Sequence, residues 1–141
     1  MRHKTVPSME AFRALPLEER KSMADRVRDQ HPGKVPIVCD RAQTCKDDIG
    51  RPKNVKFLTP STLTVAAFQR VLRRQMHNRD SSDSSDDEED KVQPHLQAIY
   101  LYCGQNGCLC PASSTLGSMH EKYAEEDGFL YISYTGENTF G

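Results

Sequence analysis

The feature that most limits the fold of this chain is a strongly acidic run in its middle, residues 78–93. Seven acidic residues fall within positions 80–90, four serines stand among them, and Val92 is the only apolar residue. Such a segment buries too little apolar surface to offset the entropy lost on ordering, so it is predicted to be a disordered loop. The fold must be built from the residues on either side of it.

Composition places the rest of the chain in one small domain. The chain has 141 residues, of which 36% are hydrophobic and 28% charged, and it has no Trp. Its net charge is −1, but most of the acids lie in the acidic run, so the remainder is basic. The basic excess is spread among Arg20, Lys21, Lys34, Lys53, Lys56, Arg73 and Arg74. No aromatic residues interleave with these charges, which favours a solvated basic face over nucleic-acid binding.

The sequence also predicts a cytoplasmic protein. No run approaches the roughly 20 apolar residues of a membrane span, and residues 1–4 are not followed by the apolar stretch of a secretion signal. The cysteines form an odd set in apolar contexts, which favours reduced thiols over a disulfide framework. They are Cys39, Cys45, Cys103, Cys108 and Cys110.

The part before the acidic run predicts two helices, two strands and a longer helix. The helices cover residues 8–14 and 17–29, with Pro16 before the second. Residues 35–39 and 55–59 are rich in β-branched and aromatic side chains and predict strands, and Pro36 predicts an edge position for the first. Thr64 can cap the next helix. Its apolar residues recur at helical spacing: Val65, Phe68, Val71, Leu72 and Met76.

After the acidic run, residues 96–103 are apolar on both alternating faces, which predicts a central strand covered on both sides. A turn at residues 104–107, a helix at 115–123, a turn at 127–128 and a strand at 129–134 follow. This order of elements predicts an α+β fold, a β-grasp sheet with the main helix on one face.

The C-terminal sequence DGFLYISYTGENTFG, residues 127–141, resembles the C-terminus of the autophagy-related protein 8 family, which includes GABARAP and the microtubule-associated light chain 3 proteins. Other similar segments, in the family's order and spacing, are ERK at 19–21, VPIVC at 35–39, KFLTP at 56–60, and LTV at 63–65 followed by Phe68. The resemblance implies a ubiquitin-like β-grasp domain at residues 32–134. It also implies two additional N-terminal helices packed on that domain (residues 1–31) and a flexible conjugation tail (residues 135–141).

The same resemblance implies a modifier of autophagosomal membranes. A cysteine protease would expose the terminal glycine, and activating and conjugating enzymes would transfer Gly141 to phosphatidylethanolamine. Glycine suits this chemistry because it places no side chain beside the carbonyl under attack. Phe140 and Gly141 would be recognised by the protease and the activating enzyme. Neither a cofactor nor catalysis by the chain itself is implied.

A groove for receptor peptides is implied as well. These peptides carry an aromatic residue and, three positions later, an aliphatic one, and they add a strand to a sheet edge. The matching positions for the aromatic pocket are Met23, Val27, Pro36, Val38, Lys56, Leu58 and Phe129. Those for the aliphatic pocket are Phe57, Thr59, Pro60, Leu63, Phe68 and Val71. Lys34, Lys53 and Lys56 would attract acids beside the motif. The sequence departs from the family at Met23, Thr59 and Gln75, where Glu, an aliphatic residue and Arg are usual.

The sequence is also compatible with other functions. Cysteines and histidines coexist, as a nucleophilic enzyme requires, but in no recognised motif. Cys103, Cys108, Cys110 and His120 could supply zinc ligands, although their spacing is not a paired C-x-x-C. The chain could also be an unconjugated ubiquitin-like adaptor, or a modifier joined to a protein as in the autophagy-related protein 12 family.

Two serines of the acidic run are candidate phosphorylation sites. Ser84 and Ser85 each precede an acid by three residues, a spacing that acid-directed kinases favour. Phosphates there would add negative charge to an already acidic segment and are expected to alter partner binding only.

Overall fold

The computed structural model describes residues 8–42, 54–80, 99–104 and 107–136, with residues 76–80 described for their backbone only. The elements in chain order are α1 (Met9–Arg13), α2 (Leu17–Gln30), β1 (Lys34–Arg41), β2 (Lys56–Pro60), α3 (Val65–Asp80), β3 (Tyr100–Cys103), β4 (Cys108–Leu109), α4 (Leu116–Tyr123) and β5 (Leu130–Thr135). Apart from the short strand β4, each of these elements was predicted from the sequence.

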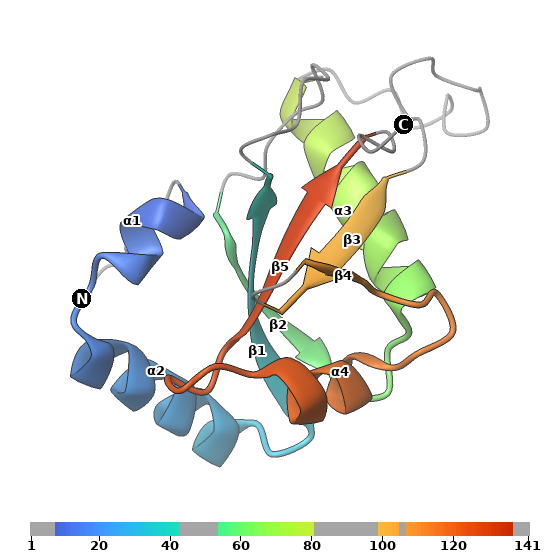
Figure 1. Ribbon diagram of the computed structural model, residues 1–141. Helices are drawn as coiled ribbons and strands as arrows, with labels where there is room; N and C mark the ends of the chain where they lie inside the picture. The colour runs from blue at the N-terminus through green and yellow to red at the C-terminus, as the bar shows by residue number, and fades with distance from the viewer. Residues whose placement is uncertain (1–7, 43–53, 81–98, 105–106, 137–141) are drawn as a thin grey trace.

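The strands form one mixed sheet in the order β2-β1-β5-β3-β4. β1 and β5 run parallel, with Ile37 opposite Leu130, while β2 is antiparallel to β1, and β3 is antiparallel to both β5 and β4. α3 lies on one side of the sheet, and α1 and α2 lie on the other (Figure 1). The predicted α+β sheet with its main helix on one face is confirmed.

Strand alternation divides the apolar side chains between two cores. On the side of α3 and α4, Ile37 and Ile132 contact a cluster that includes Phe68. On the opposite side, a smaller cluster joins the sheet to α1 and α2 through Phe12, Ala24, Val38, Val55, Phe129 and Tyr131. The sheet therefore buries apolar side chains on both faces.

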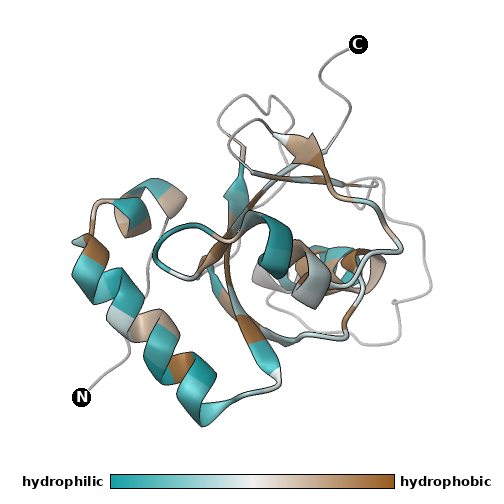
Figure 2. Ribbon diagram, turned by 60° about the horizontal axis from the view of Figure 1, so that its bottom comes forward, coloured by the Kyte–Doolittle hydropathy of each residue, from teal (hydrophilic) through white to brown (hydrophobic). Residues whose placement is uncertain are grey.

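Side-chain caps explain where several helices begin. The hydroxyl of Ser8 accepts a hydrogen bond from the Ala11 amide at 3.0 Å, and that of Thr64 accepts one from Ala67 at 3.1 Å. By contrast, α2 begins after Pro16 without a side-chain cap. Ala24 is its only fully buried residue, and most of its surface is hydrophilic (Figure 2). Its attachment to the sheet thus needs contacts beyond apolar packing.

The edge position predicted for the first strand is wrong, because β1 lies between β2 and β5. The amide of Cys39 donates to the Val55 carbonyl of the neighbouring chain segment at 2.8 Å, so alternation turns the nitrogen of Pro36 towards β5. Pairing with β5 begins only at Ile37, one residue later. The missing N–H of Pro36 therefore costs no ladder hydrogen bond.

Two predictions around the acidic run also need correction. The predicted loop start at residue 78 is wrong, because the backbone of α3 continues to Asp80. The strand predicted at 96–103 is described only from Tyr100, and only one of its faces is well covered. Leu101 is fully buried, whereas Tyr100 remains 37% exposed. The difference arises because α1 and α2 pack over β1 and β5 and do not extend over β3. The remainder of the acidic run, residues 81–93, lies outside the described residues.

Candidate peptide groove and helix docking

β2 forms one edge of the sheet and pairs only with β1 among the described strands. An edge strand offers backbone N–H and C=O groups to an added strand. Alternation along β2 sends successive side chains to opposite faces of the sheet. Residues 56 and 58 point to the face of α2, and residues 57 and 59 to the face of α3. The two sets of candidate pocket residues are therefore divided by this strand.

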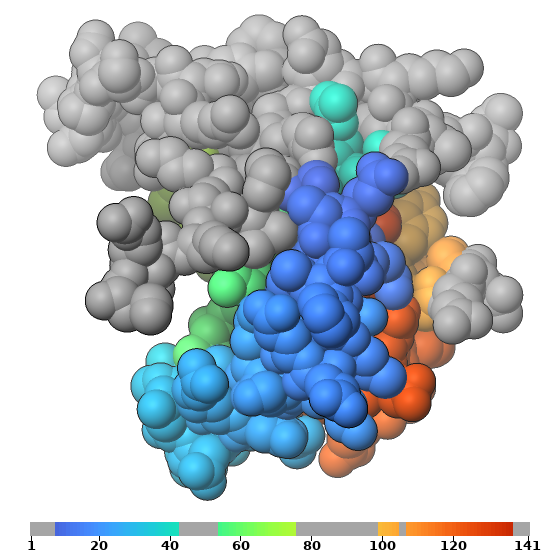
Figure 3. Space-filling model, turned by 90° about the vertical axis from the view of Figure 1, so that its left-hand side faces the viewer, coloured from blue at the N-terminus to red at the C-terminus, as the bar shows by residue number. Residues whose placement is uncertain are grey.

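The first set lies on the α2 side of β1 and β2. Leu58 pairs with Pro36, and Lys56 with Val38. Leu58 is 36% exposed, whereas Val38 is fully buried in the cluster that also holds Phe129. The remaining members are half-buried Met23 and Val27 on α2 and exposed Lys34 at the start of β1. Leu58 and Lys56 thus offer accessible surface above a buried floor. Figure 3 views α2 (blue) with the green part of the chain beside it.

The second set lies on the other side of the β2 edge. Phe57 packs edge-to-face against Phe68 of α3, with ring centroids 5.5 Å apart. Val71 follows Phe68 by three residues, which places it on the same side of the helix, and it is 37% exposed. Leu63 is half-buried, and Pro60 is exposed at the end of β2, opposite Lys34.

Thr59 departs from the aliphatic character of this second set. The residue is 7% exposed, and its hydroxyl oxygen is buried without a hydrogen-bond partner among the described residues. An unpaired buried hydroxyl costs free energy, so this position is less favourable than an aliphatic one would be.

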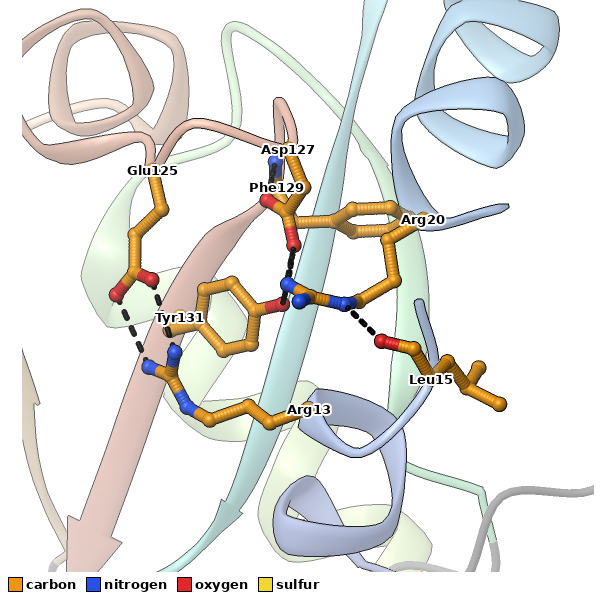
Figure 4. Close-up of polar contacts among 7 residues, drawn as sticks. All are labelled: Arg13, Leu15, Arg20, Glu125, Asp127, Phe129 and Tyr131. Atoms are coloured by element: carbon orange, nitrogen blue, oxygen red, sulfur yellow. Dashed lines mark hydrogen bonds and ion pairs between the residues drawn. The ribbon is translucent and has the colours of Figure 1, made fainter. Parts of the chain in front are cut away.

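A polar network attaches α2 to β5 and to the residues just before that strand (Figure 4). Arg20 donates to the carboxylate of Asp127 at 2.8 Å and to the carbonyl of Leu15 at 3.0 Å. Asp127 also accepts hydrogen bonds from the amide of Phe129 at 2.9 Å and from the hydroxyl of Tyr131. The expectation that Arg20 belongs to a solvated basic face is wrong, because its side chain is only 16% exposed and pairs with a fully buried carboxylate.

A second arginine connects α1 to the same region. Arg13 forms a bidentate pair with Glu125, both distances being 2.9 Å, and its guanidinium lies 3.9 Å from the centre of the Tyr131 ring (Figure 4). The Met9 amide donates to Asp40 of β1 at 2.8 Å. From the sequence, Arg13 and Glu125 have no predicted role, and Asp127 is placed only in a turn and at the start of the C-terminal segment that resembles the family. The one available signal was an acid, Asp127, directly before an apolar strand.

Burial changes the acidity of two groups in this architecture. Burial, and then the hydrogen bond donated to Asp127, raise the pKa of Tyr131 above its ordinary value of 10.0. Burial likewise raises the pKa of the Cys39 thiol well above 9.0. Both groups therefore stay protonated near neutral pH.

Several residues that the sequence singles out lie outside the described ranges. Phe140 and Gly141, and the serines Ser84 and Ser85, lie outside the described residues. Within the described ranges, no group of three or more His, Cys, Asp or Glu side chains could hold a metal ion. No helix in those ranges has the length and apolar character needed to cross a membrane.

Comparison with known proteins identifies the family. A family described as "Autophagy protein Atg8 ubiquitin like" matches residues 19–84 and 90–141. Relatives named autophagy-related protein 8 from Neosartorya fischeri and Aspergillus niger are each 34% identical over 126 residues, which cover 89% of this chain and 91% of the relative. The crystal structure of Trypanosoma brucei ATG8 superposes with a TM-score of 0.70 at 34% identity, covering 96% of this chain and all of that one. The chain therefore belongs to the Atg8 family of ubiquitin-like autophagy proteins.

Proposed function

We propose that this protein is a conjugated autophagy modifier, joined through the carboxylate of Gly141 to phosphatidylethanolamine on autophagosomal membranes. The observation that carries this proposal is the family match, which runs through residues 90–141 and so includes the whole C-terminal tail. Its partners would be the activating and conjugating enzymes and, where residues follow Gly141, a processing cysteine protease that recognises Phe140. The chain would be the transferred group and not the catalyst.

The recruiting surface of the modifier would be the edge of β2. A receptor peptide would extend the sheet, with its aromatic side chain between β2 and α2 and its aliphatic side chain beside Phe57 and Val71. Two exposed apolar side chains support this placement. Leu58 lies on one face of the edge strand, and Val71 lies one helical turn after Phe68, which packs on Phe57 at the other face. Lys34 and Lys56 supply positive charge for acids beside the motif.

Acyl chains would hold the conjugate on the membrane. Each buried methylene contributes about 0.8 kcal/mol, so the two chains of a phospholipid give a stable anchor. We expect the unconjugated chain in the cytoplasm and the conjugate on the autophagosome. Phosphorylation of Ser84 and Ser85 would change partner binding and leave conjugation intact.

The experiment compares the full chain with Gly141→Ala in cells of the source organism depleted of the native protein. Starvation should move the wild-type chain to a membrane fraction and to puncta, while the variant stays soluble but still binds an aromatic-x-x-aliphatic peptide. Membrane recruitment of Gly141→Ala equal to wild type would support an unconjugated adaptor instead. A wild-type adduct on a protein, resistant to phospholipase, would indicate a protein-conjugated modifier.

A further inference from the structure

Three cysteines gather at the β3–β4 hairpin, which the proposed function does not use. Cys103 ends β3, and Cys108 lies directly opposite in the antiparallel register. Cys110 follows β4, and its sulfur lies 3.4 Å from that of Cys103. Cys103 and Cys110 are 2% and 5% exposed, whereas Cys108 is exposed on the short outer strand.

The backbone holds these thiols in place. The Cys110 amide donates to the Leu101 carbonyl at 2.8 Å, which fixes the register beyond β4. Gly104 and Gly107 adopt φ values of 84° and 68°, which allow the tight reversal between the strands. A disulfide between Cys103 and Cys110 requires their sulfurs to approach by about 1.4 Å, a distance that side-chain rotation can supply.

We propose that Cys103 and Cys110 are a reversible thiol–disulfide pair, oxidised by hydrogen peroxide through the exposed thiol of Cys108. Access supports this order, since a peroxide in solution meets Cys108 first. The strand register supports transfer of the oxidation from Cys108 to the buried Cys103, because these two residues are directly opposed and their side chains share one face of the hairpin. Contact supports the final exchange, because the sulfurs of Cys103 and Cys110 already touch.

The oxidation takes three steps. The Cys108 sulfur attacks one oxygen of hydrogen peroxide and becomes a sulfenic acid, and the other oxygen leaves as water with the thiol proton. The Cys103 sulfur then displaces the sulfenic hydroxyl, which takes the Cys103 proton and leaves as a second water. Finally Cys110 attacks the Cys103 sulfur and expels Cys108, which regains a proton from Cys110. Two thiols lose two electrons and two protons, and one peroxide becomes two waters.

Acidity within the pair agrees with these roles. The hydrogen bond from the Cys110 thiol lowers the pKa of Cys103, while the same bond, followed by burial, raises the pKa of Cys110. Of this pair, Cys103 is therefore the sulfur with more thiolate character, and it is the one that attacks the sulfenic acid of Cys108. Cys39 is the contrasting case, a buried thiol on β1 whose pKa burial raises. It should stay unreacted in the folded protein.

The test uses the full chain, reduced and then exposed to increasing hydrogen peroxide. Free thiols are blocked with N-ethylmaleimide after denaturation, and tandem mass spectrometry of digested peptides reads each cysteine. Wild type should lose the adducts at Cys103 and Cys110 together, keep those at Cys108 and Cys39, and regain both after dithiothreitol. Oxidation of Cys108 to sulfinic acid, with Cys103 and Cys110 still alkylated, would overturn the proposal.

Variants test the order of events. Cys108→Ser should slow formation of the Cys103–Cys110 bond, and Cys110→Ala should trap a bond between Cys103 and Cys108. An unchanged rate in Cys108→Ser would remove the role of the exposed thiol. Cooperative thermal unfolding of each variant is checked first, and the wild-type pattern decides the pairing even if a variant fails to fold. The proposal is independent of lipid conjugation, which is measured separately.

Discussion

Arg20 of α2 and Asp127, three residues before β5, form an ion pair of 2.8 Å across 107 residues of sequence. The arginine side chain is 16% exposed and the carboxylate is fully buried. A buried charge is strongly destabilising when its partner is removed. This pair, together with the small cluster around Phe12, therefore attaches the largely hydrophilic α2 to the ubiquitin-like sheet.

Replacing Arg20 by Ala should lower the free energy of unfolding by about 3 kcal/mol, because Asp127 would stay buried with only the Phe129 amide and the Tyr131 hydroxyl as donors. The matched control is Arg13→Ala. Its ion pair is more exposed, with side chains 44% and 21% exposed, so a loss of about 1 kcal/mol or less is expected even with the Tyr131 contact included. Urea unfolding measures both, and equal losses would contradict the ranking.

Tyr131→Phe should reveal a pH-dependent contribution to stability. Because the pKa of Tyr131 is raised in the folded state, the unfolded chain loses this proton first as pH rises, so the contribution is present below about pH 10 and lost above it. At neutral pH the variant should be less stable by about 1–2 kcal/mol, since Asp127 loses a donor. The gap to wild type should narrow above pH 10 in urea titrations. A gap that stays constant with pH would show that the hydroxyl titrates normally.

Thr59→Val should stabilise the protein by about 1 kcal/mol, because it replaces a buried hydroxyl without a partner by a methyl group of similar size. It should also tighten binding of a peptide whose aliphatic residue enters the second pocket. Thr64→Val is the control, because it removes the cap of α3 and should cost about 1 kcal/mol. Thermal unfolding and peptide titration measure the effects. Destabilisation by Thr59→Val would mean that its hydroxyl is paired.

Much of the fold could be predicted because its signals are local. Ser8, Thr64 and Thr115 begin helices through contacts with residues three positions later, and such spacing is visible in the sequence. The candidate groove could be predicted only by resemblance to a family. Its residues come from α2, β1, β2, α3, the segment between β2 and α3, and the residue just before β5, and no local pattern links them.

The remaining features depend on contacts between distant segments. The sequence alone predicts a solvated Arg20, because nothing local in it shows that Asp127 lies next to this residue in the fold. Pro36 is tolerated in this inner strand because it lies one residue before the point where β1 begins to pair with β5. Tyr100 belongs to a run that is apolar on both faces, as in a central strand, yet its exposure depends on how far α1 and α2 extend.

Lys56→Glu should weaken binding of an acidic aromatic-x-x-aliphatic peptide by about 1 kcal/mol at low salt, mainly through slower association, because exposed charges act chiefly on encounter. Lys122→Glu is the matched control. It makes the same change of charge on α4, next to Tyr123, whose ring lies against Gly104 at the far end of the sheet. Stopped-flow measurements at two salt concentrations separate the two. Equal effects of both variants would argue against a groove at β2.

The central claim is tested most directly by reconstitution. The chain ending at Gly141 is incubated with activating and conjugating enzymes from its own source, ATP and liposomes containing phosphatidylethanolamine, and the product is weighed by mass spectrometry. We predict an ATP-dependent adduct of one phosphatidylethanolamine less one water, mapped to Gly141 and absent from Gly141→Ala. The absence of any adduct on the wild-type chain, while a known substrate of the same enzymes is modified in parallel, would contradict the account.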